Sequence, residues 1–160
     1  MAEHLEIAEG DKTEKYRLLL KQIKALVEAE KDLIAVLANV SSMIHNTFGF
    51  LWTGFYLVKD AVLVVGPFQG PLACNRIQYG KGVCGETWKR GETIIVPDVE
   101  QFPGHIACSS ESKSEIVVPM KIDDEVKAVI DIDSNELSAF DTTDALWLGE
   151  IASTLSTLFK

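Results

Sequence analysis

The chain has 160 residues, of which 47% are hydrophobic, and its formal net charge is −9. This size and composition allow one sizeable hydrophobic core. The charge balance argues against nucleic acid or an anionic membrane as a partner, because binding to phosphate depends on clustered Lys and Arg, and no such cluster is present. No segment approaches the roughly 18 apolar residues that a membrane span needs, and the first ten residues do not resemble a signal peptide. We therefore expect a cytoplasmic protein.

The first third of the chain predicts two helices after a polar tail at residues 1–10. Asp11 and Glu14 have the spacing of a helix capping box, and the segment that follows carries one apolar stripe. A second apolar stripe at helical spacing follows in residues 32–48. Residues 11–160 are expected to form one domain, because the sequence shows no linker, repeat or low-complexity segment.

The rest of the chain predicts mainly strands. FLWTGFYLV and AVLVVGPF are strand-like and are separated by Lys59 and Asp60, which indicates a β-hairpin. VCGETWKRG suits a short helix that ends at Gly91. Strands are expected at 115–122 and 126–133, and a last helix at 141–159, whose acidic residues are expected to be solvated. The fold class is therefore α+β: a mostly antiparallel sheet with the N- and C-terminal helices packed on one face.

The register of the final hairpin decides where its charges lie. A two-residue loop at Asp123 and Asp124 would place Ile116 opposite Asp131. A three-residue loop that also includes Glu125 would make one face wholly apolar, which burial should select because a one-residue slip inverts every side chain. We predict this second register, with the pairs Ile116–Ile132, Val118–Ile130, Met120–Ala128 and Ile122–Val126.

The same register gathers three carboxylates on the opposite face. Glu115 falls opposite Asp133, and Asp131 lies two residues away on the same strand and face. Like charges placed opposite one another destabilise a sheet, so the cluster needs an explanation. Exposure to solvent is one, and a hard cation is another. A third is a ligand ammonium that neutralises two charges while the third carboxyl stays protonated, and the raised pKa of that carboxyl would make it a general acid.

All three cysteines lie in the loop-rich middle of the chain, at Cys74, Cys84 and Cys108. A free Cys is most often a small buried hydrophobic residue, which suits Cys84 in GVCGETW best and Cys108 in ACSSESKSE least. The odd number leaves at least one thiol free, and no CxxC pair favours a structural zinc site. His105 could lower the pKa of Cys108, but a lone loop His is more often solvated, so we do not assign it to the site.

Two sets of motifs resemble a known family. YGKGVCGETWKRGETIIVPDVEQFPGH, followed by SEIVVPMKIDDEVKAVIDIDS, resembles the core of a GAF domain, a small-molecule-binding fold with a central antiparallel sheet. This resemblance runs from about Asp32 to the C-terminus. The cysteine motifs GPLACNRI, GKGVCGETW and HIACSSESKSEIVVP resemble those of the free methionine-(R)-sulfoxide reductases, an enzyme branch of that fold.

The resemblance implies roles for individual residues. Cys108 would be the nucleophile, Cys74 would resolve it, and Cys84 would be a supporting or alternative resolving thiol in the pocket. The substrate site would contain Trp52, against the methyl end of the substrate, together with three acids, Glu115, Asp131 and Asp133. Strand alternation places Tyr56 on the same face as Trp52, so we assign Tyr56 to the site as well.

The expected reaction is thiolate attack on the sulfur of free methionine sulfoxide, with Glu115 or Asp133 protonating the departing oxygen. Cys108 sulfenic acid would then condense with Cys74, whose Cα must come within roughly 6 Å. Acids paired with the substrate ammonium would reject peptide-bound methionine.

The resemblance further implies a thioredoxin-type dithiol as reductant, and a homodimer is common in the family. We expect no cofactor and no metal. The alternatives are a non-catalytic GAF sensor of a small molecule and a redox switch that forms the same disulfide without turnover. The three carboxylates argue against an anionic ligand for such a sensor. Release of methionine from the free sulfoxide, measured for the wild type and for Cys108→Ser, distinguishes the enzyme from the sensor and the redox switch.

Overall fold

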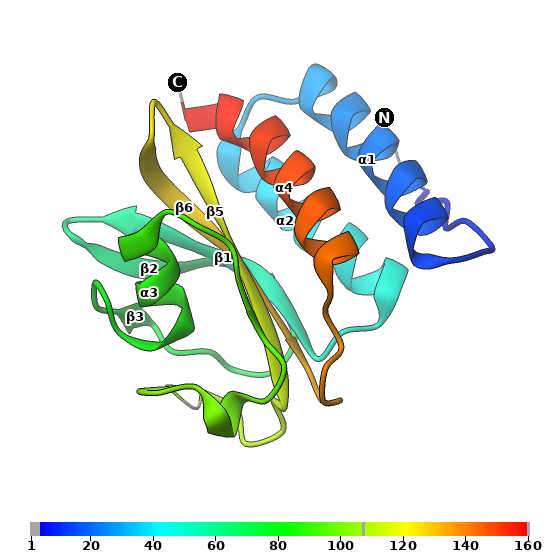
Figure 1. Ribbon diagram of the computed structural model, residues 1–160. Coiled ribbons are helices and arrows are strands. Elements are labelled where there is room, and N and C mark those ends of the chain that lie inside the picture. The colour runs from blue at the N-terminus through cyan, green and yellow to red at the C-terminus, as the bar shows by residue number, and fades with distance from the viewer. Residues whose placement is uncertain (1–3, 107, 160) are drawn as a thin grey trace.

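The computed structural model describes residues 4–106 and 108–159 and contains a six-stranded sheet of order β3-β2-β1-β6-β5-β4. All neighbouring strands are antiparallel. Three long helices cover one face of the sheet, and a short helix lies on the other (Figure 1). The α+β class and the placement of the terminal helices are therefore confirmed. The strands are β1 (Trp52–Lys59), β2 (Val62–Gln69), β3 (Arg76–Ile77), β4 (Ile94–Val96), β5 (Ser114–Ile122) and β6 (Glu125–Ser134).

The helical layer is formed by α1 (Lys12–Ala29), α2 (Leu33–Phe48) and α4 (Thr142–Ser156). Asp11 caps α1 by accepting a hydrogen bond from the backbone N–H of Glu14, and Asp32 caps α2 in the same way. Such caps satisfy the N–H groups that a helix leaves free in its first turn. None of the described helices is long and apolar enough to cross a membrane.

The last helix differs from the prediction in two ways. It ends at Ser156 and is followed by a short 3-10 turn at Thr157–Phe159. One of its acids, Asp144, is not solvated but buried, where it accepts hydrogen bonds from the Tyr16 hydroxyl and the Lys12 ammonium, each at 2.6 Å. These two bonds join the start of α1 to the start of α4.

Side-chain alternation along the strands separates two hydrophobic cores. Phe55 packs into the core beneath the helical layer, whereas Trp52 and Tyr56 point to the opposite face. That second core lies under α3 (Gly82–Arg90), which ends at Gly91 in the left-handed conformation, as predicted. The second face also carries the odd-numbered positions of β5 and β6, including Glu115 and Asp131.

The β1–β2 turn lies one residue later than predicted. Asp60 and Ala61 are its two central residues, with φ of 51° and 62°, and β2 begins at Val62. A two-residue turn with both φ values positive matches the right-handed twist of the paired strands.

The loop of the β5–β6 hairpin was predicted wrongly, although the predicted register holds beside the carboxylates. The turn has two residues, Asp123 and Asp124, both with positive φ. A bulge between Met120 and Lys121 then shifts the pairing by one residue, so Ile122 pairs with Glu125 rather than with Val126. Beyond the bulge the other three predicted pairs are present, because the bulge absorbs the residue that we assigned to the loop. These pairs are Ile116–Ile132, Val118–Ile130 and Met120–Ala128.

Candidate active site

A partly open pocket lies on the α3 face of the sheet, between α3 and the loops that carry Cys74 and Cys108. It holds about 560 Å³ of empty space, including open solvent at its mouth. The second hydrophobic core forms part of its floor. All but one of the residues that the sequence assigned to the site line it: Trp52, Tyr56, Cys84, Cys108, Glu115, Asp131 and Asp133. The remaining one, Cys74, is bonded to Cys108.

The three carboxylates are gathered as the strand register predicts. Glu115 on β5 lies opposite Asp133 on β6. Glu115 and Asp131 are each only 6% exposed, and Asp133 is half-buried, so exposure to solvent does not explain the cluster. Asp133 accepts a hydrogen bond from the Ser112 hydroxyl at 3.0 Å.

A glycine on β1 makes room for an aromatic ring beside these acids. Gly54 pairs with Asp131 on β6. A Cβ atom at Gly54 would lie 2.7 Å from the ring of Trp52 and 2.4 Å from Cβ of Phe68, which no real side chain tolerates. The missing side chain therefore allows the Trp52 ring to pack closely over Gly54.

Burial changes the proton affinity of the whole cluster. Desolvation raises the pKa of Glu115 well above its usual range, and the charges of Asp131 and Asp133 raise it further. The pKa of Asp133 is also raised well above its usual range by burial and by Asp131, while the Ser112 hydrogen bond opposes the shift. Burial raises the pKa of Asp131, but the protonated side chains of Glu115 and Cys84 beside it favour its charged form and partly offset the increase. Asp131 is therefore the first of the three to ionise, and Glu115 and Asp133 both hold a proton more tightly than an exposed carboxyl does.

The three cysteines occupy two different environments. Cys74 and Cys108 form a disulfide with a Cα–Cα distance of 5.7 Å, across 34 residues of sequence. Cys84 is free and only 3% exposed, near the start of α3. Burial raises the pKa of the Cys84 thiol well above its usual range, and the neighbouring acids raise it further. Cys84 is thus a protonated thiol at neutral pH and a poor nucleophile in this state.

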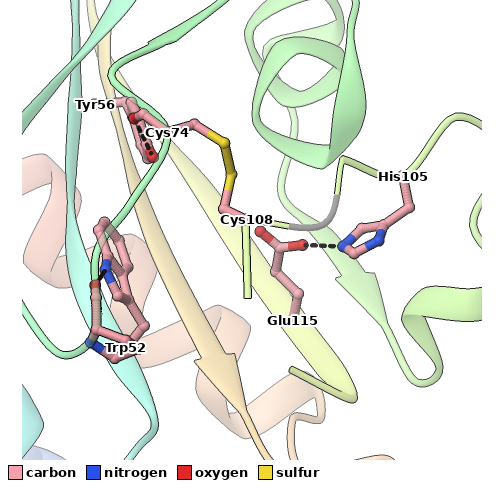
Figure 2. The surroundings of a disulfide bond; sticks show 7 residues. Trp52, Tyr56, Cys74, His105, Cys108 and Glu115 are labelled. Atoms are coloured by element: carbon pink, nitrogen blue, oxygen red, sulfur yellow. Dashed lines mark hydrogen bonds and ion pairs between the residues drawn. A yellow bond between two sulfur atoms is a disulfide. The ribbon is translucent and has the colours of Figure 1, made fainter. Parts of the chain in front are cut away.

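The aromatic side chains hold the segment that carries Cys74. Trp52 stacks on Tyr56, with ring centroids 5.9 Å apart. The Trp52 indole N–H donates a hydrogen bond to the carbonyl of Pro71 at 3.1 Å, and the Tyr56 hydroxyl donates one to the carbonyl of Cys74 at 3.0 Å. Figure 2 shows these two bonds beside the disulfide. Tyr56 and Trp52 thus form one wall of the pocket and also fix residues 71–74.

Sequence reasoning missed two polar residues of this site. His105 was predicted to be solvated, but its side chain is 16% exposed and its Nε2 lies 3.8 Å from Oε1 of Glu115 (Figure 2). Burial lowers the pKa of His105, although Asp131 opposes this, so the imidazole is neutral at physiological pH. Ser112 is the second. Both lie in a loop without periodicity, so only their nearness in sequence to Cys108 and Glu115 pointed to them.

Comparison with known proteins identifies the family of the chain. The family model of the GAF domain matches residues 30–160. The chain belongs to the GAF domain family. The GAF domain-containing protein A of Dictyostelium discoideum is 52% identical to it over 156 residues, covering 97% of this chain and 99% of that protein.

Two further relatives indicate the branch of the family. The free methionine-R-sulfoxide reductase of Escherichia coli is 40% identical over 146 residues, covering 91% of this chain and 88% of that protein. The X-ray structure of the free methionine-R-sulfoxide reductase of Neisseria meningitidis in complex with its substrate is 49% identical. It superposes with a TM-score of 0.95 over 98% of this chain and 95% of that one. This GAF domain protein is closely related to free methionine-R-sulfoxide reductases.

Proposed function

We propose that this GAF domain protein reduces free methionine (R)-sulfoxide to methionine. The observation that supports this most is the position of the Cys74–Cys108 disulfide, which lies at a pocket whose floor is a buried cluster of three acids. A redox-active pair beside a proton donor is what sulfoxide reduction requires, and two relatives carry the name of that enzyme.

Substrate binding is assigned to the two acids on β6. Asp131 ionises first in the cluster, so it supplies a negative charge for the substrate's α-ammonium. Asp133, whose charged form the Ser112 hydrogen bond favours, supplies the second charge once the ammonium is bound. An ammonium placed there would relieve the mutual repulsion of the acids. Peptide-bound methionine has no such ammonium and would leave the buried charges without a partner, which disfavours its binding. The stacked rings of Trp52 and Tyr56 give an apolar wall for the thioether end.

Proton transfer is assigned to Glu115. The Ser112 hydrogen bond favours the charged form of Asp133, whereas for Glu115 burial and both neighbouring charges favour the protonated form. Glu115, whose raised pKa favours the protonated form, delivers a proton to the sulfoxide oxygen as the S–O bond breaks.

The covalent steps are assigned to the two paired cysteines. The Cys108 thiolate attacks the sulfoxide sulfur and forms an S–S bond to it. The protonated oxygen then moves from the substrate sulfur to the Cys108 sulfur as the S–S bond breaks, so methionine leaves as the thioether and Cys108 is left as a sulfenic acid. The Cys74 thiol then attacks this sulfur and expels water, which forms the disulfide that the structure contains. Two thiols are thus oxidised to one disulfide, while one sulfoxide is reduced to a thioether and water.

Regeneration requires an external dithiol, for which a thioredoxin-type protein is our proposal. Cys108 is an exposed residue and lines the open pocket, so a dithiol protein can approach the disulfide there. Two apolar side chains at the pocket lining are also exposed, Leu72 at 88% and Ile106 at 39%. They provide a surface beside the disulfide on which a reductant could rest.

The test is an assay of methionine release from free L-methionine (R)-sulfoxide, with a chemical dithiol as reductant. Wild-type protein should turn over, and Cys108→Ser should not, whereas the exposed-surface variant Glu111→Gln should match the wild type. Full activity in Cys108→Ser would remove the nucleophile assignment. An inactive wild type would favour a sensor or a redox switch. Peptidyl methionine sulfoxide turned over at a similar rate would remove the role of the ammonium.

A further inference from the structure

The acid cluster and the free cysteine lie close together in the same pocket. The Sγ atom of Cys84 and one carboxylate oxygen each of Glu115 and Asp131 all lie within 4.8 Å of one another. Each of the three residues is more than nine-tenths buried. They come from three different elements, α3, β5 and β6, so the sheet and the helix that covers it hold them together.

One atom of this group has no partner. Oδ1 of Asp131 is buried and accepts no hydrogen bond from any described residue. A buried carboxylate oxygen without a donor costs free energy, so the folded chain retains an acceptor that a positive ligand would satisfy. Asp131 is part of the lining of the partly open pocket, so its side chain lies against the space that a ligand would occupy.

We propose that this pocket binds Zn²⁺, or a cation of similar softness, through Cys84, Glu115 and Asp131, and that the bound metal excludes the substrate. The second part rests on the proposed function, because it places the metal where the substrate's ammonium would lie. The metal is a reversible inhibitor of the reductase and has no part in its reaction.

The donor set selects the class of metal. A thiolate with two carboxylates suits Zn²⁺ and Cd²⁺, whereas Mg²⁺ and Ca²⁺ prefer oxygen ligands throughout. Three protein ligands and an open side match the ligand number of a zinc site that keeps one position for water. Binding releases the thiol proton of Cys84 to solvent, because only the thiolate is a metal ligand.

The disulfide form of the protein makes the test unambiguous. The chain has three cysteines, and two of them are joined, so Cys84 is the only thiol that remains. Cd²⁺ is added to this oxidised protein, and its thiolate-to-metal charge-transfer absorption is followed in the near ultraviolet together with the heat of binding. We expect a band that saturates at one metal ion per chain, and an excess of Mg²⁺ or Ca²⁺ should not reduce it.

Variants then locate the ligands. Cys84→Ser should abolish the band, and Asp131→Asn should weaken metal affinity at least about tenfold, the lower range for the loss of supporting groups at metal sites. Asp131→Asn keeps the thiol, so it remains informative if Cys84→Ser does not fold. Glu111→Gln, which removes an exposed acid beside the same loop, should leave both band and affinity unchanged. Tight binding without the band, or a band that Asp131→Asn does not weaken, would overturn the metal site.

Competition with methionine tests the second part separately. Added L-methionine should raise the apparent dissociation constant of Cd²⁺ in proportion to its concentration, and Zn²⁺ should inhibit the reductase until a chelator is added. If methionine leaves the Cd²⁺ band unchanged, the metal site stands but the shared subsite is overturned, and with it the ammonium assignment. If no band forms while the enzyme turns over, the metal proposal fails and the proposed function stands.

Discussion

The hydroxyl of Ser112 donates a hydrogen bond to Asp133, whereas Glu115, the cross-strand partner of Asp133, lies beside a neutral imidazole. Two acids that face each other across one strand pair thus have different polar partners, although burial raises the pKa of both. A hydrogen bond to the charged form of an acid lowers its pKa. We therefore assign Asp133 to binding of the substrate ammonium and Glu115 to donation of the proton. This asymmetry is the basis of the first prediction.

Glu115→Gln is expected to lower kcat by about two to four orders of magnitude, the usual worth of a general acid. In the wild type, kcat should fall as pH rises through the raised pKa of Glu115, since only the protonated carboxyl can donate. Asp133→Asn should act mainly on KM. Steady-state kinetics across pH measure both effects, with Glu111→Gln as the control. A variant at Glu115 that keeps the wild-type pH profile would rule out its role as the acid.

The buried carboxyl of Glu115 should destabilise the folded state at neutral and alkaline pH. The pKa of Glu115 is higher in the folded than in the unfolded chain, so the folded state binds more protons between the two values. The free energy of unfolding therefore decreases as pH rises above 4.5, the usual value for Glu. Glu115→Gln removes this cost, worth about 1.4 kcal/mol for each unit of pKa shift.

Thermal unfolding measured across pH tests this stability prediction. The Tm of Glu115→Gln should exceed that of the wild type at about pH 8 and match it at about pH 4, where the wild-type carboxyl is protonated in both states. Equal Tm values at both pH values would mean that burial does not perturb Glu115.

Periodicity was enough to predict the face on which the acids lie. Alternation along β5 and β6 placed Glu115, Asp131 and Asp133 together because the other face had to be apolar. The same rule separated Phe55 from Trp52 and Tyr56. These inferences succeeded because a period of two is fixed by the strand itself and does not depend on distant parts of the chain.

What could not be predicted depends on local backbone geometry or on contacts between distant segments. The loop length failed because Asp123 and Asp124 adopt positive φ, which their residue type permits but does not require. A bulge then restored the register, and no feature of Met120 or Lys121 indicates one. His105 lies in a loop, where no period relates its position to Glu115.

The hydroxyl of Tyr56 is expected to control how quickly the disulfide closes. It donates to the carbonyl of Cys74 and so holds the segment that must meet Cys108. Tyr56→Phe keeps the ring against Trp52 and removes only this bond, which costs about 1 kcal/mol of stability. In a single turnover, methionine release should be unchanged while the disulfide forms severalfold more slowly. Equal slowing of both steps would point instead to a role of Tyr56 in substrate binding.

Asp144 is expected to be the main polar anchor between the terminal helices. Its carboxylate is 1% exposed and accepts from both Tyr16 and Lys12. Asp144→Ala leaves the buried hydroxyl without its acceptor and should cost about 3 kcal/mol of unfolding free energy. Glu150→Ala, on the exposed side of the same helix, should change it by less than about 0.5 kcal/mol. Chemical denaturation measures both, and similar values for the two variants would contradict the anchor.

The order of the thiol steps can be read from Cys74→Ser. This variant keeps the nucleophile but lacks the thiol that lies 5.7 Å away, Cα to Cα, so the Cys108 sulfenic acid has no partner at that position. We expect one methionine to be released per chain, followed by arrest of turnover with a dithiol protein as reductant. Mass spectrometry after trapping with a sulfenic-acid reagent should locate the oxygen on Cys108.

Whether turnover stops completely in Cys74→Ser depends on the buried thiol of Cys84. Cys84 is held protonated by burial, so it should not replace Cys74 at a comparable rate. The double variant Cys74→Ser/Cys84→Ala should therefore accumulate the same sulfenic acid as Cys74→Ser alone. If the single variant instead forms a Cys84–Cys108 disulfide as quickly as the wild type closes its own, α3 must move enough to bring Cys84 to Cys108. Cys84 would then be a second resolving thiol rather than a residue of the pocket floor.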